Sequence, residues 1–432
     1  MSRGIFVRSA FFVVLFSGMT LGWEARSAGF DNNEVGLRGV SMGTALHGIA
    51  DDGSAVYYNP AGLVLIDEGV MNVEAYTYLI FTKFRYSTHM PVADSENEST
   101  EIPVIPGGFI TQSFDRIGVG LGVNVPYGGG GVVYKDFSGT DTTLEASAGF
   151  FGISASAAVE VVRQYLAVGV TPTIYIGTME NKMSPDPMSD MRVVSKNSGY
   201  AGVGMSLGIM SAPLEEKLKL GLILRSPVHV EMDGTVDTTA SVLPAPMESD
   251  STMSFMLPME LTLGVGSSPI PALTLGLTGT VIFHGMMDEL TSKTTSTSPV
   301  TGQKETITTV TKTHYKHNFR IALGAEYMII KQFGVRAGIQ FIQSPSKDKG
   351  LVPTSNDVSQ LLPSLGLAVK PVHFLEIGIA GAYIMGFERT RKSDMSLPQQ
   401  DGTVATVSLK ETFDADHWML IAGLRFDWDF IR

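Results

Sequence analysis

Hydrophobic and polar residues alternate one by one along most of the chain from Val70 onward. The last segment shows the pattern most clearly, because every second residue is apolar and the residues between include charged ones. The apolar set comprises Trp418, Leu420, Ala422, Leu424, Phe426, Trp428 and Phe430, and the other set comprises His417, Met419, Gly423, Arg425, Asp427 and Asp429. Successive side chains of a β-strand point to opposite faces, so this alternation predicts a strand with one apolar and one polar face.

The same alternation recurs in roughly 14 segments, an even number as in single-chain bacterial barrels. They begin near residues 70, 103, 116, 148, 165, 197, 217, 252, 272, 314, 332, 361, 373 and 417. The connections alternate between tight turns, such as Lys331-Gln332, and long polar stretches, such as Thr291 to Lys312 and Thr390 to Asp416. Short turns at one rim and long loops at the other are typical of outer-membrane barrels.

The pattern therefore predicts an all-β protein in which residues 69–432 form a 14-stranded antiparallel transmembrane β-barrel. Residues 28–68 show no strand alternation and contain several glycines. We predict that they form an N-terminal hatch, a plug of short helices and turns, because a barrel of this size would otherwise hold an open channel. A soluble β-sandwich is the alternative, but it seldom needs strands this apolar over about 12 residues.

Composition agrees with a membrane barrel and excludes several other classes. The 432-residue chain has 47 glycines, no cysteine and only 17% charged residues. Beyond the N-terminus, no apolar run reaches the roughly 20 residues that a membrane helix needs. The net charge of −12 argues against a nucleic-acid partner, and the lack of cysteine excludes disulfides and thiolate metal sites.

Residues 1–27 have the features of a secretory signal peptide. Arg3 and Arg8 supply positive charge, Ala10 to Met19 is apolar, and Ala25-Arg26-Ser27 places small residues at both positions that determine cleavage. We expect cleavage before Ala28 and localisation in the cell outer membrane. An uncleaved N-terminal anchor is the alternative, although the apolar stretch is short for that role.

Three short motifs follow one another in the predicted hatch. Ala28-Gly29-Phe30 begins the mature chain, Ala50-Asp51-Asp52 follows a glycine-rich stretch, and Asn59-Pro60-Ala61 ends the hatch. In this order and at this spacing they resemble the long-chain fatty-acid transporter family of outer-membrane proteins (FadL/TodX-like), which includes transporters of toluene-like hydrocarbons. The resemblance covers the mature chain, through these motifs up to about residue 65 and mostly through the strand pattern beyond.

The resemblance implies that substrate binds in an apolar pocket beside the N-terminus and leaves sideways through a gap in the wall at a kinked third strand. It implies that Phe30 contacts the substrate and that Asn59, Pro60 and Ala61 line the hatch near this gap. The third predicted strand has glycine at three successive positions of one face, namely Gly118, Gly120 and Gly122. Glycine inside a strand often marks a bend, and making room for the hatch is an equal alternative.

A fatty acid also needs a partner for its carboxylate, and arginine binds carboxylates through two parallel hydrogen bonds. The face predicted to line the barrel interior offers Arg225, Arg320, Arg336 and Arg425. Arg225 and Arg320 are predicted nearer the middle of the barrel, so we favour them as substrate-binding residues. The alternative is that interior arginines pair with interior acids, for which Glu231, Glu260, Glu326 and Glu376 are available.

These features predict passive uptake of hydrophobic small molecules, with long-chain fatty acids as the first candidate. Aromatic hydrocarbons taken up by the same route are the alternative, and a general porin is less favoured. The predicted partners are the hydrophobic ligand, outer-membrane lipid, lipopolysaccharide and the barrel assembly machinery. We predict no catalytic residue, metal site or cofactor, because the histidines are scattered and neither a nucleophile elbow nor a phosphate loop occurs. One departure is the C-terminus, where Phe430 is followed by two further residues although such barrels usually end on an aromatic one.

Overall fold

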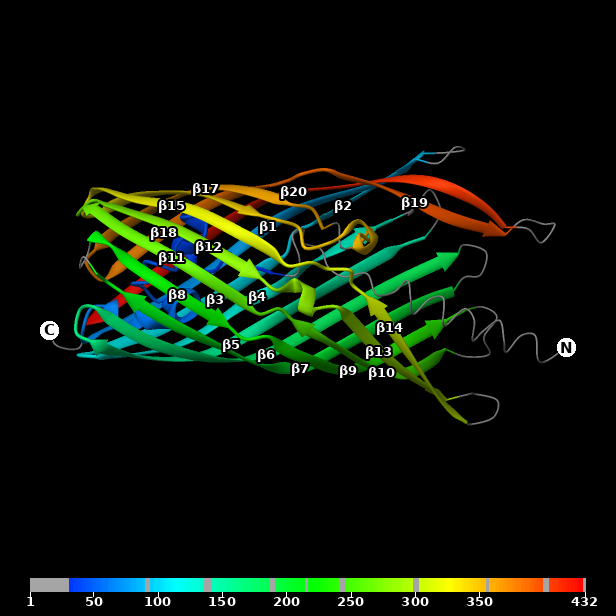
Figure 1. Ribbon diagram of the computed structural model, residues 1–432, viewed down its shortest axis with the longest axis horizontal. Helices are drawn as coiled ribbons and strands as arrows, with labels where there is room; N and C mark the ends of the chain where they lie inside the picture. The colour runs from blue at the N-terminus through cyan, green and yellow to red at the C-terminus, as the bar shows by residue number, and fades with distance from the viewer. Residues whose placement is uncertain are drawn as a thin grey trace.

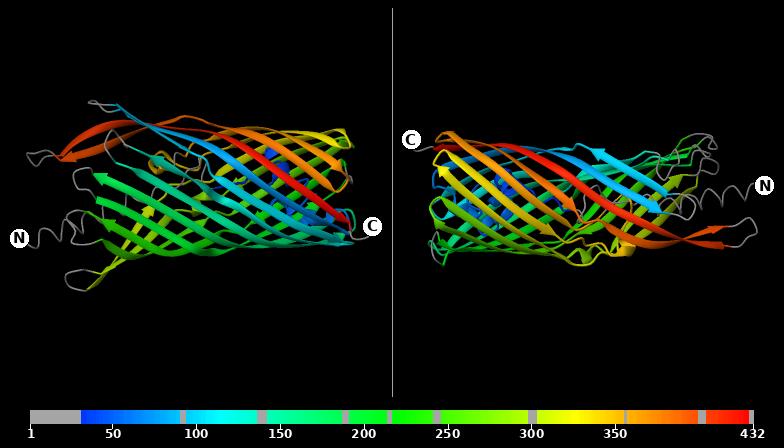
Figure 2. Two further views of the ribbon diagram at one scale, coloured as in Figure 1. Left: turned by 180° about the vertical axis from the view of Figure 1, so that it is seen from behind. Right: turned by 90° about the horizontal axis from the view of Figure 1, so that it is seen from above.

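The computed structural model describes residues 31–89, 94–135, 142–186, 191–213, 217–240, 246–297, 303–354, 357–398 and 404–429. Its strands wrap into a barrel around an N-terminal segment, which is blue in Figure 1 and Figure 2 and lies toward the end of the barrel where the C-terminus is marked. This segment is the hatch, and it contains the helices α2 (Leu37–Ser41) and α3 (Ala55–Tyr58) and the 3-10 helix η1 (Pro60–Leu65). Among the residues described, no helix is long and apolar enough to cross a membrane.

The strands pair antiparallel with their neighbours in the chain, and β1 pairs with β20 along its whole length to close the barrel. Several crossings are interrupted, so that each of the following pairs makes one crossing: β2 with β3, β8 with β9, β10 with β11, β12 with β13, β14 with β15 and β18 with β19. Counted in this way the barrel has 14 strands, which confirms the predicted fold class. Their bounds are β1 (Val70–His89), β2 (Asp94–Glu101), β3 (Val104–Phe114), β4 (Ile117–Tyr134), β5 (Leu144–Val162), β6 (Leu166–Asp186), β7 (Met191–Ser211), β8 (Lys219–Arg225), β9 (Val228–Thr239), β10 (Met247–Leu257), β11 (Glu260–Ile270), β12 (Leu273–Ile282), β13 (Glu289–Thr297), β14 (Lys304–Lys312), β15 (Asn318–Ile330), β16 (Phe333–Ile342), β17 (Gln360–Val372), β18 (Leu375–Gly386), β19 (Arg389–Pro398) and β20 (Val404–Asp429).

Outward-facing side chains form an apolar belt that aromatic residues bound on both sides. On β20 the outward-facing Leu420, Leu424 and Phe426 lie between Trp418 and Trp428, whose side chains are 60% and 62% exposed. The separation of the two tryptophans corresponds to about 25 Å along a tilted strand, which is the height of the lipid-facing band of transmembrane barrels. The alternation in the sequence therefore separates a lipid-facing surface from the barrel interior.

The two stretches predicted as long polar loops, Thr291 to Lys312 and Thr390 to Asp416, instead carry β13, β14, β19 and the first half of β20. These strands continue the barrel beyond the apolar belt, as the hairpins that project from the barrel in Figure 1 show. A strand with water on its outer side needs no apolar face. The hydropathy pattern therefore ends at the edge of the belt although the strand pairing continues.

The hatch packs directly against the backbone of the barrel wall. Gly43 has a φ of +58°, and a side chain there would meet the backbone of Ile339. In return, a Cβ atom on the inward-facing Gly338 would lie only 2.1 Å from the Gly43 nitrogen. The wall glycines that approach the hatch in this way include Gly118, Gly169, Gly208, Gly221, Gly264, Gly276, Gly324, Gly338, Gly366 and Gly378. The high glycine content thus allows the hatch to fill the barrel at this level.

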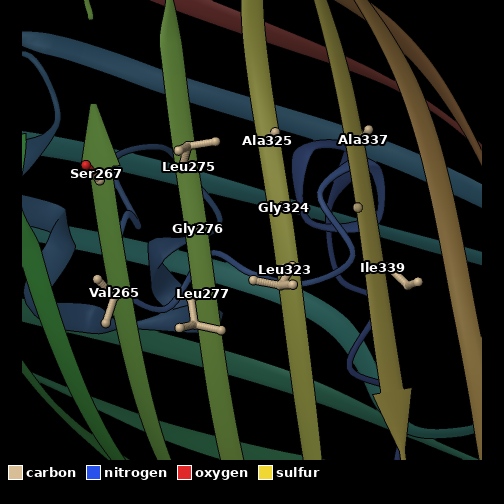
Figure 3. A pocket seen from close by; sticks show the side chains of 11 residues that line it. Val265, Ser267, Leu275, Gly276, Leu277, Leu323, Gly324, Ala325, Ala337 and Ile339 are labelled. Atoms are coloured by element: carbon tan, nitrogen blue, oxygen red, sulfur yellow. The ribbon is translucent and has the colours of Figure 1, made fainter. Parts of the chain in front are cut away.

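An apolar hollow lies on the outer side of the same wall. Figure 3 shows it across β11, β12, β15 and β16, with the hatch visible behind the strands. Its lining includes Leu275, Leu277, Leu323 and Ile339, which are all exposed outward-facing side chains. Because the hollow faces outward within the apolar belt, it lies on the opposite side of the wall from the interior where substrate is expected to bind.

Candidate functional site

An apolar cluster rich in aromatic residues and methionine fills the barrel interior on the long-loop side of the hatch. The rings of Phe150 and Phe255 meet edge to face at 6.0 Å, and those of Tyr127 and Tyr175 lie 5.8 Å apart. Methionine side chains adapt their shape readily, so four of them in one cluster allow repacking around an apolar ligand. We call this set the upper apolar cluster; its members are Tyr127, Ala148, Phe150, Tyr175, Met179, Ala201, Val228, Val230, Met232, Met253, Phe255, Leu257, Met287, Leu290 and Tyr315.

Arg225 and Arg320 meet next to this cluster, at its border with the hatch. Glu260 joins them: its Oε2 atom lies 2.8 Å from Arg225 Nη1 and 3.6 Å from Arg320 Nη2. Arg225 also donates to the backbone oxygen of Tyr57 in the hatch at 3.1 Å, and its guanidinium lies 4.6 Å from the centre of the Tyr57 ring. The structure thus brings both predicted arginines together and gives them one acid of the predicted set of partners.

Arg320 keeps unused hydrogen-bonding capacity although its side chain is almost completely buried. Its exposed fraction is 1%, and its Nε and Nη1 atoms have no hydrogen-bond partner among the described residues. Leaving a buried donor without a partner costs about 1–3 kcal/mol. A ligand carboxylate that accepted hydrogen bonds from these two nitrogens would remove this cost.

Asp31, the first described residue of the hatch, belongs to the same charged group. Neither of its carboxylate oxygens accepts a hydrogen bond from a described residue, and its Oδ2 atom lies 3.8 Å from Nε2 of the buried His284. Burial raises the pKa of Asp31 to about 6, while the neighbouring His284 acts in the opposite direction. We call Asp31, Arg225, Glu260, His284 and Arg320 the upper charged cluster.

The residue after Asp31 ties the beginning of the hatch to β4. The backbone N–H of Asn32 donates to the Pro126 oxygen at 2.8 Å, and its side-chain amide donates to the Val125 oxygen at 2.7 Å. Just before this point β4 leaves β3: their pairing ends at Gly108 and Val123, whereas β4 continues along β5 to its end. The register of β4 against β5 also shifts twice here, between residues 124 and 130. The hatch therefore contacts the wall where two adjacent strands separate.

A second charged group lies on the short-turn side of the hatch. Arg38 of α2 donates to Asp52 at 3.1 Å, to Glu326 at 2.7 Å and also to Asp51. Burial alone would raise the pKa of Asp51, but the charges of Arg38 and Lys219 more than offset this and the net pKa lies below its usual value. Both aspartates of the Ala50-Asp51-Asp52 motif thus hold α2 through one arginine.

The barrel wall continues this group from strand to strand. Glu326 accepts from Arg336 at 2.6 Å, Arg336 donates to Glu376 at 2.8 Å, and Glu376 lies 2.8 Å from Arg425. Arg336 and Arg425, two of the four arginines predicted for the interior, therefore pair with interior acids. We call Arg38, Asp51, Asp52, Glu326, Arg336, Glu376 and Arg425 the lower ion-pair network.

Comparison with known proteins gives this architecture a family. Residues 18–430 match the model of a family described as outer membrane protein transport protein (OMPP1/FadL/TodX). The chain belongs to this family. Outer membrane protein P1 of Haemophilus influenzae is 25% identical over 427 residues, covering 84% of this chain and 87% of the relative.

Solved structures of OMPP1/FadL/TodX-type proteins share the fold. A FadL homologue from Pseudomonas aeruginosa superposes with a TM-score of 0.72 at 16% identity. The superposition covers 93% of this chain and 100% of the homologue. The toluene transporter TodX of P. putida gives a TM-score of 0.71 at 14% identity, covering 92% and 99%. At these identities the likeness concerns the fold. Membership of the family makes this chain an outer-membrane transport protein for hydrophobic compounds.

The Asn-Pro-Ala motif of this family member holds the hatch against two neighbouring strands of the wall, β6 and β7. Asn59 caps η1 by accepting from the N–H of Ala61 at 3.1 Å, and it donates to the His47 oxygen within the hatch and to the Ile209 oxygen of β7. Pro60 and Ala61 pack against Gly169 of β6. These residues therefore fix the hatch to β6 and β7, and their place beside a gap in the wall stays a prediction.

The three glycines of the third strand, now β4, make room for the hatch. Gly118 lies against Leu63, and Gly120 and Gly122 lie against Val56. All three keep regular register with both neighbouring strands, and the irregular part of β4 follows them. Pro126 and the glycine run that follows it are the sequence signal for that irregularity.

Sequence patterns alone did not identify Asp31, Asn32 and His284, because no periodicity links the start of the hatch to the wall. Phe30, the predicted aromatic contact, and residues 1–27, the predicted signal peptide, lie outside the described residues, as does Phe430. Within the described part of the chain, no three histidine, aspartate or glutamate side chains are grouped so that they could hold a metal ion.

Proposed function

We propose that the protein takes up hydrophobic molecules that carry a carboxylate, long-chain fatty acids above all, passively across the outer membrane. The observation that supports this proposal is Arg320. It lies buried beside the upper apolar cluster, two of its nitrogens have no hydrogen-bond partner in the described part of the chain, and it shares Glu260 with a second arginine. An aliphatic chain in the apolar cluster would bring a terminal carboxylate to these guanidinium groups, which bind carboxylates well.

The proposed path leads sideways out of the barrel. The hatch fills the interior below the upper charged cluster, whereas the wall loses strand pairing between β3 and β4 beside Asn32. The substrate would leave there into the membrane, with Phe30 contributing at the N-terminus, Asn59, Pro60 and Ala61 holding the hatch, and Gly118, Gly120 and Gly122 accommodating it. This transport needs no cofactor and no catalytic step. It does need export by the signal peptide and insertion by the barrel assembly machinery into a membrane of lipid and lipopolysaccharide.

The test compares binding of a long-chain fatty acid with binding of the fatty alcohol of equal length. We expect Arg320→Met to weaken fatty-acid binding by about 10- to 100-fold, because a hydrogen bond to a charged group contributes about 1.5–3 kcal/mol. Binding of the alcohol should be unchanged, and Arg225→Met should have a smaller effect of the same kind. Arg163→Met, at an exposed ion pair with Asp115, is the control. Unchanged fatty-acid affinity in both arginine variants would refute the carboxylate assignment.

Uptake of aromatic hydrocarbons is the second candidate. The aromatic and methionine side chains of the upper apolar cluster favour it, and so does the likeness to a solved toluene transporter. This candidate predicts binding of toluene that neither arginine substitution changes. A general porin would instead conduct small ions, which a planar-bilayer measurement would detect.

A further inference from the structure

We propose that Lys316, Lys347 and Lys349 form a binding site on the outer face of the barrel for the phosphorylated glycolipid of the outer leaflet, lipopolysaccharide. The inference rests on the outer-membrane location of the proposed function, and on the long-loop end facing the outside of the cell, as it does in outer-membrane barrels. It concerns the lipid-facing surface and is independent of the substrate site in the interior. Three observations support it: an aromatic boundary, the grouping of the lysines, and the absence of neutralising acids among the residues that the structure describes.

The aromatic boundary lies on the outer face of β15 and β16 and at the ends of β12 and β18. The ring centres of Phe319 and Phe341 lie 5.9 Å apart, and those of Phe341 and Phe387 lie 6.2 Å apart. The ring centres of Phe283 and His317 lie 5.3 Å apart. Aromatic residues of membrane proteins gather at the level of the lipid headgroups. This row therefore marks where hydrocarbon gives way to headgroups at the long-loop end.

The three lysines come together on two segments directly beyond that row. Lys316 precedes Phe319 on the segment that leads into β15, and its N–H donates to the Pro345 oxygen at 2.8 Å. The N–H of Lys347 donates to the His314 oxygen at 3.1 Å, so the two segments run side by side. Lys349 follows in the 3-10 helix η5 (Asp348–Gly350). All three side chains are exposed.

The charge of this group is not neutralised by the described residues. Ion-pair geometry places no carboxylate within reach of Lys316, Lys347 or Lys349 in the part of the chain that the structure describes. The acid between them, Asp348, is bound by Arg389 at 2.7 Å. Clusters of basic residues beside a membrane bind anionic headgroups, with each residue near the surface contributing.

The basic residues at the corresponding position on β1 show the opposite arrangement. Lys83 lies 2.9 Å from Glu98, and Arg85 pairs with Asp414 and lies 3.6 Å from Asp416. The barrel surface thus balances its own cations on β1 but leaves them unbalanced beside β15 and β16. An external phosphate group would supply the missing charge, and the attached acyl chains would lie on the apolar belt below the aromatic row.

The experiment measures binding of bis-phosphorylated lipid A to the purified full-length mature protein in mixed micelles. We expect the triple variant K316Q/K347Q/K349Q to bind lipid A about 100-fold more weakly, given the contribution of each basic residue near an anionic lipid surface. K196Q/K293Q/K304Q removes the same charge from exposed lysines on β7 and near the tip of the β13–β14 hairpin and should bind as the wild type does. The K316R/K347R/K349R variant keeps the charge and should retain binding, which separates lost charge from misfolding.

Dephosphorylated lipid A should bind the wild-type protein as weakly as intact lipid A binds the K316Q/K347Q/K349Q variant, and millimolar inorganic phosphate should not displace lipid A. Equal binding by both glutamine variants, or displacement by free phosphate, would overturn the proposal. Fatty-acid binding is measured in parallel and should be the same in all variants. Weaker binding of lipid A to K316Q/K347Q/K349Q, with fatty-acid binding unchanged, therefore supports this site alone. If the wild-type protein did not bind fatty acid at all, that result would count only against the proposed function.

Discussion

The hatch carries charged groups on both sides, and they are built differently. In the lower ion-pair network each arginine has a carboxylate within 3.1 Å, and every carboxylate is held by an arginine. Among the described residues, one nitrogen each of Arg336 and Arg425 in this network lacks a hydrogen-bond partner. In the upper charged cluster two arginines share Glu260, and two nitrogens of Arg320 and both carboxylate oxygens of Asp31 lack a hydrogen-bond partner among the same residues. Because unpartnered buried polar atoms reduce stability and the lower side has fewer of them, the lower side is suited to hold the hatch and the upper side is suited to receive a charged ligand.

The largest expected effect comes from breaking the lower network. Replacing Arg38 by Met leaves Asp51, Asp52 and Glu326 without their common partner. Removing one member of a buried ion pair typically costs about 3–5 kcal/mol. We therefore expect the free energy that protects the hatch backbone from local opening to fall by about this amount, as measured by hydrogen exchange of residues 37–58.

Arg163→Met removes an arginine from an exposed pair with Asp115 and provides the matched control. Exposed pairs contribute about 0–1 kcal/mol, so exchange in the hatch should stay as it is in the wild type. Equal protection in the Arg38 and Arg163 variants would show that the lower network does not hold the hatch, and the contrast between the two sides would lose its basis.

The two charged groups also show which features of the protein can be predicted from its sequence and which cannot. Strand alternation predicts the barrel because contact with lipid requires an apolar outer face on every membrane crossing. The alternation also places Arg225 and Arg320 on the interior face, because every second side chain of a strand points to the same side. The pairing of these arginines with Glu260 depends on how neighbouring strands align, which parity does not determine. The contacts of Asp31 and Asn32 with β4 depend on an irregular segment that follows no period at all.

A smaller effect is expected from the glycine contacts that seat the hatch. A Cβ atom on Gly338 would lie 2.1 Å from the Gly43 nitrogen, whereas one on the outward-facing Gly279 would meet nothing within 4 Å. Overpacking of a well-packed site costs about 1–3 kcal/mol. We expect Gly338→Ala to lower the protection of the hatch against hydrogen exchange by this amount and Gly279→Ala to leave it unchanged.

Unchanged exchange in Gly338→Ala would mean that the hatch can move away from the wall at little cost, so that backbone contact does not seat it. The same pair of variants can be examined in planar bilayers, since a displaced hatch would open a path for ions. Conductance in the Gly338 variant but not in the Gly279 variant would connect the seating of the hatch with closure of the barrel.

The smallest effect concerns the upper side, where a substitution should improve function. Asp31→Asn removes a negative charge that competes with a ligand carboxylate for Arg320 and Arg225. We expect fatty-acid affinity to rise roughly fivefold, about 1 kcal/mol, which is the interaction of two unit charges about 4 Å apart at the dielectric constant of water. Because the pKa of Asp31 is raised to about 6, its carboxyl gains a proton as the pH falls through that value. The advantage of the variant over wild type should therefore be largest above pH 6 and disappear below it.

Comparing the two proteins at each pH cancels the ionisation of the ligand itself, and isothermal titration supplies the affinities. A weaker affinity in the variant at neutral pH would show that Asp31 supports the ligand site, and the upper charged cluster would then be a structural group like the lower one.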